Sequence, residues 1–137
     1  MGSRVERAVK NRQSGYNCSQ AVACAFCEEL GIDEVQMYQV LEGFGLGMGC
    51  MEGVCGAISG AVAIAGMKVN RNPQLSGSNR KETYQISREI ITRFKEKNKS
   101  IICKELKGVD TGKPLRDCQG CVADAATILE SIAFQPK

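Results

Sequence analysis

Signals for the starts and ends of helices recur along the whole chain, and no stretch shows the apolar and polar alternation of a strand. Such a chain must bury its apolar helix faces against one another. We therefore predict an all-α helical bundle of about five or six helices. Helical signals, some of them short, are found at residues 5–13, 18–30, 33–44, 53–69, 81–97, 100–108 and 117–133. The expected N-caps are Asn17, Asp33, Ser100 and Asp117, and Gly31 and Gly108 are expected to end helices.

The length of 137 residues is sufficient for one domain with its own core, so we expect a single domain over residues 1–137. The 18 basic and 15 acidic residues alternate along the chain, which is typical of solvated helix faces and not of a nucleic-acid surface. The start of the chain lacks the apolar core of a signal peptide, and the longest apolar stretch, at 54–67, is shorter than the ~20 residues that cross a bilayer. These features predict a cytoplasmic protein without nucleic-acid binding or membrane insertion.

The chain contains eight cysteines but no histidine and no tryptophan. Cytoplasmic thiols are normally kept reduced, so this many cysteines indicates a metal-binding or redox-active site more than a fixed disulfide framework. The absence of histidine excludes a Cys-His nucleophile pair and a mixed Cys/His zinc site. Any chemistry must therefore combine thiolates with carboxylates, hydroxyls or backbone amides.

Four cysteines fall at predicted helix starts, namely Cys18, Cys55, Cys103 and Cys118. The unpaired amides and the positive end of the dipole at a helix N-terminus favour thiolate over thiol and lower the pKa. A lone cysteine at such a position is more often core packing, but four together predict one redox or metal centre. Cys55 also follows the glycine-rich turn GFGLGMG, so we expect it to be the most activated thiol.

The other four cysteines give weaker signals. Cys24 and Cys27 form CAFC inside the segment at 18–30, where helical steps of 100° turn them away from Cys18, so their pKa values are expected near or above that of a free thiol. Cys121 completes CQGC with Cys118 at a helix start, which is a better redox geometry but a weak motif. Cys50 is either a resolving thiol or incidental.

The helix after Cys55 is rich in small residues. Gly56, Gly60 and Ala63 share one face that has no side-chain bulk, so another backbone is expected to approach it closely. Each glycine there costs ~1 kcal/mol of helix propensity relative to alanine, which close packing would offset. The opposite face, which includes Ile58 and Ala61, is expected to be ordinary core.

At CGAISG, residues 55–60, the chain resembles the C-GCAxxG-C-C family of redox-active proteins, which is named for its cysteines and this motif. NCSQAV is similar to the family's first cysteine block, GFGLGMG with CGAISGAV to the central block, ICKELKG to the third and CQGCVADAATIL to the last. The order CGA differs slightly from the family name. The resemblance covers nearly the whole chain and matches the family positions to Cys18, Cys55, Cys103 and Cys118, whereas the other four cysteines have no counterpart.

The family is more distantly similar to the non-haem part of split-Soret cytochromes, where related cysteines are associated with an iron-sulfur centre. The resemblance and the four thiols together predict a small redox protein. Either the four cysteines Cys18, Cys55, Cys103 and Cys118 hold a 2Fe-2S cluster for electron transfer, or thiols cycle between dithiol and disulfide with Cys55 and Cys118 as the catalytic residues.

The alternative is a structural zinc site on the same four cysteines, or a helical interaction module without catalysis. We expect a redox partner protein, which the sequence does not identify. The sequence also leaves open whether the protein is an enzyme and whether it forms a homodimer.

Overall fold

The computed structural model describes residues 3–73 and 75–134, and it is built from helices. The long helices are α1 (Ser3–Gln13), α6 (Gly56–Val69), α7 (Arg80–Asn98) and α9 (Cys118–Ala133); the shorter ones are α2 (Cys18–Cys24), α3 (Cys27–Leu30), α4 (Glu34–Leu41), the 3₁₀ helix η1 (Glu42–Phe44), α5 (Gly45–Met48) and α8 (Cys103–Lys107). The described residues contain no strand, only one isolated antiparallel bridge between Val54 and Ile102. The predicted all-α class is confirmed, with more helices than the five or six expected.

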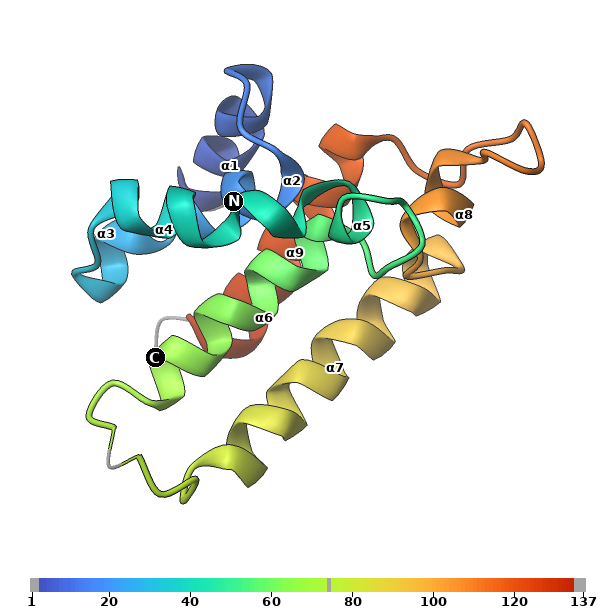
Figure 1. The fold of residues 1–137 in the computed structure, drawn as a ribbon. Helices are drawn as coiled ribbons and strands as arrows, with labels where there is room; N and C mark the ends of the chain where they lie inside the picture. The colour runs from blue at the N-terminus through green and yellow to red at the C-terminus, as the bar shows by residue number, and fades with distance from the viewer. Residues whose placement is uncertain (1–2, 74, 135–137) are drawn as a thin grey trace.

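Helix α6 packs against α2, α7 and α9, and α1 closes the bundle against α2 and α9. In Figure 1, α6 and α7 run side by side, and α9 passes behind α6. The core between them contains fully buried apolar side chains such as Ile58, Ile64, Ile90, Phe94 and Leu129. Helices α5 and α8 contact each other beside the first residues of α6, so several helix ends meet at one end of the bundle.

The small-residue face of α6 packs on the backbone of α2, as predicted for Gly56 and Gly60. A Cβ atom at Gly60 would lie 2.4 Å from the carbonyl oxygen of Ser19, and one at Gly56 would lie 3.2 Å from the Ser19 nitrogen. Ala63 is only half-buried and lies outside this contact. The glycines therefore set the distance between the helix that begins at Cys18 and the helix that follows Cys55.

The predicted helix at 18–30 is interrupted between α2 and α3. The amides of Ala25 and Phe26 donate to the carbonyls three residues earlier, Val22 and Ala23, at 3.2 and 3.1 Å, so the helix tightens and ends. The fully buried Phe26 ring packs on the Phe134 ring, with the centroids 5.0 Å apart. Burial of this aromatic side chain accounts for the break, after which α3 ends at Gly31 in the left-handed conformation, as predicted.

Two further helix starts differ from the prediction. The segment expected from residue 53 becomes helical only at Gly56, because the Cys55 amide donates to the Ile101 carbonyl (2.7 Å) and the Cys103 amide donates to the Gly53 carbonyl (3.0 Å). The expected cap Ser100 lies two residues before the true N-cap, Ile102, and its hydroxyl accepts a hydrogen bond from the Ile102 amide (3.0 Å). These contacts join the starts of α6 and α8.

Residues 70–79 form a polar loop between α6 and α7, and Gln74 within it lies outside the described residues. Gly108 ends α8 in the left-handed conformation, as predicted. Within residues 3–73 and 75–134, no helix combines the length and the apolar character needed to cross a bilayer.

Candidate thiol site

The four predicted cysteines lie at the starts of four helices. Cys18 and Cys118 are the first residues of α2 and α9, Cys103 is the first residue of α8, and Cys55 is the N-cap residue of α6. Two of these starts are capped by local side chains. Asn17 accepts a hydrogen bond from the amide of Gln20 (2.9 Å), and the Asp117 carboxylate accepts one from the amide two residues after Cys118 (2.7 Å). The chain thus fixes the first turn of α2 and of α9 through residues that adjoin the thiols.

All four thiols line one cavity of about 240 Å³, and a fifth cysteine, Cys121, lines it with them. Cys118 is half-buried and the most open of the five, whereas the other four are buried. All eight cysteines of the chain are free thiols in this structure. The structure therefore brings together every cysteine that the sequence analysis selected, and it adds one.

The cavity thiols interact as two pairs, Cys18 with Cys118 and Cys55 with Cys121. The interaction with the Cys18 thiol is the main reason that the pKa of Cys118 falls to about 5, and burial opposes this shift. The same interaction, together with burial, raises the pKa of Cys18. Each pair thus combines one thiol of lowered pKa with one of raised pKa, because the pKa of Cys55 is likewise lowered by its interaction with Cys121, whose own pKa is raised.

Cationic side chains from two other helices stabilise the Cys118 thiolate. The Lys107 ammonium of α8 donates to the Cys118 sulfur at 3.2 Å. Lys107 and the Arg12 guanidinium of α1 both contribute to the low pKa of Cys118. Neither cation was selected from the sequence, although Lys107 is the last residue of the short helix that begins at Cys103.

The remaining two helix-start thiols behave differently from each other. Besides its interaction with Cys121, the Cys55 sulfur accepts hydrogen bonds from the amides of Ala57 and Ile58 in the first turn of α6, which lower its pKa against the effect of burial. Burial instead raises the pKa of Cys103, and the nearby Cys55 adds to this shift. Helix-start activation therefore fails at Cys103, which begins a helix of only five residues.

The glycine-rich turn forms part of the wall around Cys103. Gly47 has a φ of +56°, and a Cβ atom there would lie 2.4 Å from the Cys103 Cβ. Glycine is required at this position both for its left-handed backbone and for close approach to the thiol-bearing residue. Leu46, its neighbour in the turn, lines the cavity. The turn thus positions Cys103 and encloses the cavity, in addition to leading into the helix after Cys55.

The other three cysteines do not line the cavity. Cys24 and Cys27 form a separate pair, in which the Cys24 thiol points toward the carbonyl of Glu34 (3.8 Å) and the Cys27 thiol toward that of Ala23 (3.6 Å). The expectation of unactivated thiols holds for Cys24 but is wrong for Cys27, whose pKa is lowered by its interaction with Cys24. The break after α2 makes Cys27 the first residue of α3. Cys50 is exposed.

Within the described part of the chain, no three or more histidine, cysteine, aspartate or glutamate side chains are grouped as ligands for a metal ion. The five thiols share a cavity, and their strongest interactions are those of Cys18 with Cys118 and of Cys55 with Cys121, whereas Cys103 is in neither pair. As arranged here, the site is organised as two dithiols.

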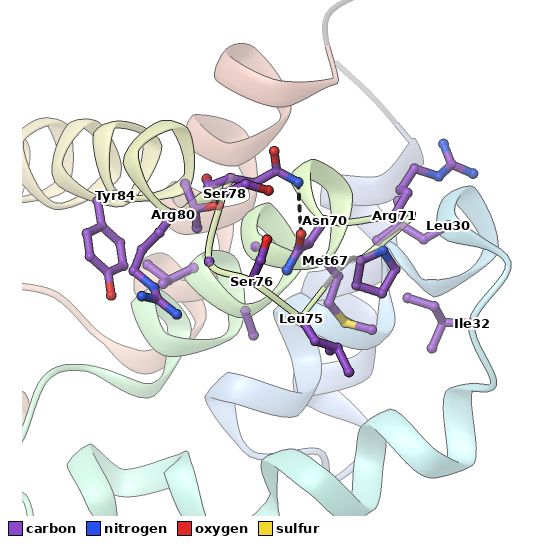
Figure 2. Close-up of a pocket in the computed structure, with 17 residues that line it drawn as sticks. Leu30, Ile32, Met67, Asn70, Arg71, Leu75, Ser76, Ser78, Arg80 and Tyr84 are labelled. Carbon is purple, nitrogen blue, oxygen red and sulfur yellow. Dashed lines mark hydrogen bonds between the residues drawn. The ribbon is translucent and has the colours of Figure 1, made fainter.

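A larger cavity of about 910 Å³ lies elsewhere, between the C-terminal end of α6, the loop after it and the start of α7. Figure 2 shows its walls, with Met67 and Leu75 beside polar groups and with Asn79 hydrogen-bonded to Asn70. Its described lining residues include no cysteine and no carboxylate. The four helix-start thiols selected from the sequence are all in the smaller cavity, and we assign the candidate site there.

A comparison of the chain with known proteins identifies its family. No curated protein and no solved structure matches the chain significantly. A family model described as "Putative redox-active protein (C_GCAxxG_C_C)" matches residues 16–132, a segment that contains all five cavity cysteines. The chain therefore belongs to the C_GCAxxG_C_C family of redox-active proteins.

Proposed function

We propose that the protein carries out thiol-disulfide exchange, with Cys118 as the attacking thiolate and Cys18 as the resolving thiol. One observation carries the proposal: the half-buried Cys118 sulfur lies 3.2 Å from the Lys107 ammonium and interacts with the Cys18 thiol at the start of another helix. An attacking thiolate next to a protonated second thiol, with a cation to stabilise it, is the arrangement that exchange requires.

The exchange proceeds in two displacements. The Cys118 thiolate attacks one sulfur of an external disulfide, RSSR, whose S–S bond breaks to release RS⁻ and leave a mixed disulfide on Cys118. The Cys18 thiol then loses its proton and attacks the Cys118 sulfur, which expels the second RS⁻. The products are two RSH and a protein disulfide, so two electrons pass from the dithiol to the substrate.

The second pair, Cys55 and Cys121, is the source of electrons that we propose for resetting the first. Cys55 is the more acidic thiol of this pair; it helps to raise the pKa of Cys18, and Cys118 opposes the lowering of the Cys55 pKa. Attack of the Cys55 thiolate on the disulfide of Cys18 and Cys118 would free one of these thiols and form a mixed disulfide with the other. Attack of Cys121 on the Cys55 sulfur would then release the second thiol and leave Cys55 and Cys121 joined as a disulfide. The reverse exchange through Cys18 and Cys118 would then let a redox partner protein return the two electrons at Cys118, the most open thiol of the cavity.

A 2Fe-2S electron-transfer centre is the second candidate, because five cysteines line the cavity, more than the roughly four ligands that such a cluster needs. Cys18, Cys55, Cys103 and Cys118 would hold it, and it would supply one-electron transfer. A zinc ion would use the same four ligands. The pairwise interactions of the thiols and the absence of a three-ligand group in the described residues favour exchange over both metal sites.

The test compares variants in which one cysteine at a time is replaced by serine, each purified anaerobically and reduced. We expect Cys118→Ser to abolish reduction of bis(2-hydroxyethyl) disulfide, and Cys18→Ser to trap the mixed disulfide on Cys118, detected by mass spectrometry of intact protein and peptides. Cys50→Ser is the matched control, because Cys50 is exposed and lies outside the cavity. Full activity in Cys118→Ser would refute the proposal, and stoichiometric iron and acid-labile sulfide with a visible absorption spectrum would support the cluster instead.

A further inference from the structure

The walls of the thiol cavity carry three cationic side chains and, among the described lining residues, no carboxylate. The three cations are Arg12, Lys107 and Arg116. Arg116 is held from behind by the buried carboxylate of Asp124, with its Nε 3.1 Å from Oδ2. The ion pairs of the described residues include neither Arg12 nor Lys107.

The Arg12 guanidinium interacts with the Cys18 and Cys118 thiols, and it has one further donor that the described protein does not use. Its Nε atom is buried and has no hydrogen-bond partner among the described residues. One terminal nitrogen of the guanidinium donates weakly to the Tyr16 carbonyl, at 3.5 Å. A buried guanidinium N–H without an acceptor is costly, so an arginine at a cavity wall in this state is suited to an acceptor that enters with a ligand.

The size of the cavity limits what can enter. A volume of about 240 Å³ lies below the ~300–1,000 Å³ that is typical of pockets for drug-sized ligands. A folded partner could reach Cys118 only at its half-buried edge, whereas a small molecule could contact Cys118 and Arg12 together.

We propose that this cavity selects small disulfides that carry carboxylates, with Arg12 as the residue that recognises the negative charge. This inference rests on the exchange function proposed above and names its substrate class. The substrate carboxylate accepts hydrogen bonds from the Arg12 guanidinium, while the Cys118 thiolate attacks the nearer sulfur of the substrate disulfide. The reaction consumes one dithiol and one R–S–S–R and yields the disulfide of Cys18 and Cys118 and two carboxylate-bearing thiols.

The first test measures charge selection without requiring turnover. Iodoacetate and iodoacetamide alkylate the same thiolate, so the ratio of their rates at Cys118 cancels changes in thiolate fraction and reports only the preference for a negative reagent. We expect Arg12→Gln to lower this ratio about three- to tenfold, as expected for loss of one nearby cation in a partly solvated site. Lys104→Gln removes the same charge from α8 outside the cavity, where Lys104 pairs with Glu52 and Asp110, and should leave the ratio unchanged.

Arg12→Lys should retain most of the preference. If Arg12→Gln does not fold, the wild-type ratio is compared at low and high salt and again in urea, where the native ratio should fall with salt while the ratio of the unfolded chain stays low. An unchanged ratio in folded Arg12→Gln, or a native ratio equal to that of the unfolded chain, would overturn the inference.

The second test compares three disulfides of similar size that differ in charge: dithiodiglycolate, bis(2-hydroxyethyl) disulfide and cystamine. We expect kcat/KM to fall in that order in the wild type and to become nearly equal for the first two in Arg12→Gln. Equal reduction of all three by the wild type would refute the substrate class while leaving the exchange function intact. Reduction of none would refute the exchange function, and the alkylation ratio would still decide whether the cavity selects anions.

Discussion

The contact between α2 and α6 gives a quantitative prediction for Gly60→Ala. A Cβ at Gly60 would lie 2.4 Å from the Ser19 carbonyl oxygen, about 1 Å short of the shortest ordinary contact of 3.4 Å. The neighbouring atoms are backbone, so relief requires that the two helices move apart. Overpacking of this kind costs ~1–3 kcal/mol, whereas alanine gains ~1 kcal/mol of helix propensity over glycine.

Gly66→Ala in the same helix is the matched control, because its Cβ would meet only the Thr83 methyl group at 3.6 Å, an ordinary contact. We expect Gly66→Ala to stabilise the protein by up to ~1 kcal/mol and Gly60→Ala to be less stable than Gly66→Ala by ~1–3 kcal/mol. In thermal unfolding this is a separation of roughly 3–12 °C for a domain of this size.

The assay is thermal and urea unfolding of both variants in the presence of reductant, so that no disulfide contributes. Because α2 begins at Cys18 and α6 follows Cys55, Gly60→Ala should also slow exchange through Cys18 and Cys118. Equal or greater stability of Gly60→Ala relative to Gly66→Ala would show that the backbones are not in close contact there, and the reasoning would fail.

Three further predictions concern charges around the cavity. Lys107→Met should raise the pKa of Cys118 above about 5, because it removes the cation at 3.2 Å; iodoacetamide alkylation should then slow at pH 6 but not at pH 10. Asp124→Asn should lower the free energy of unfolding by ~1–3 kcal/mol at pH 7, since it weakens the charge-assisted hydrogen bonds that the buried carboxylate accepts from Arg116 and Lys97, two cations that stay partly exposed to water. Burial raises the pKa of Asp124, but hydrogen bonds from Lys97, Arg116 and Asn98 lower it overall, so the difference between wild type and variant in urea unfolding should persist at neutral pH and shrink as the pH falls below the ordinary value of 3.8. Asp117→Ala should cost ~0.5–2 kcal/mol in urea unfolding through loss of the α9 cap, and Asp117→Asn should restore most of it.

The parts of the site that follow from local sequence were predictable. Asn17 and Asp117 cap the helices that begin at Cys18 and Cys118. Each hydrogen bond joins two residues three positions apart, so both partners can be identified from a short stretch of sequence. The starts of α6 and α8 could not be located in the same way. They depend on the bridge between Val54 and Ile102, which joins segments far apart in the sequence.

Cavity residues that come from elements distant in the sequence also could not be predicted. The sequence shows Cys121 only as part of a weak CQGC motif. Its interaction with Cys55 depends on how α9 packs against α6 and cannot be read from that motif. Arg12 was part of a charged segment that resembled a solvated face, and only the packing of α1 turns it toward the thiols. The lowered pKa of Cys27 follows from its interaction with Cys24, three residues earlier, which the expectation from helix position alone leaves out.

The pairing of Cys18 with Cys118 links the redox state of the protein to the stability of its fold. The two residues are 100 positions apart, so a disulfide between them would close a loop that spans most of the chain. Loop-closure entropy for about 100 residues is worth up to ~4.7 kcal/mol, a large part of the 5–15 kcal/mol that holds a typical domain folded. By thermodynamic linkage, folding stabilises this disulfide as much as the disulfide stabilises folding. Each turnover would therefore alternate the protein between two forms. The oxidised form, with the disulfide, resists unfolding, and the reduced form unfolds and is degraded more readily.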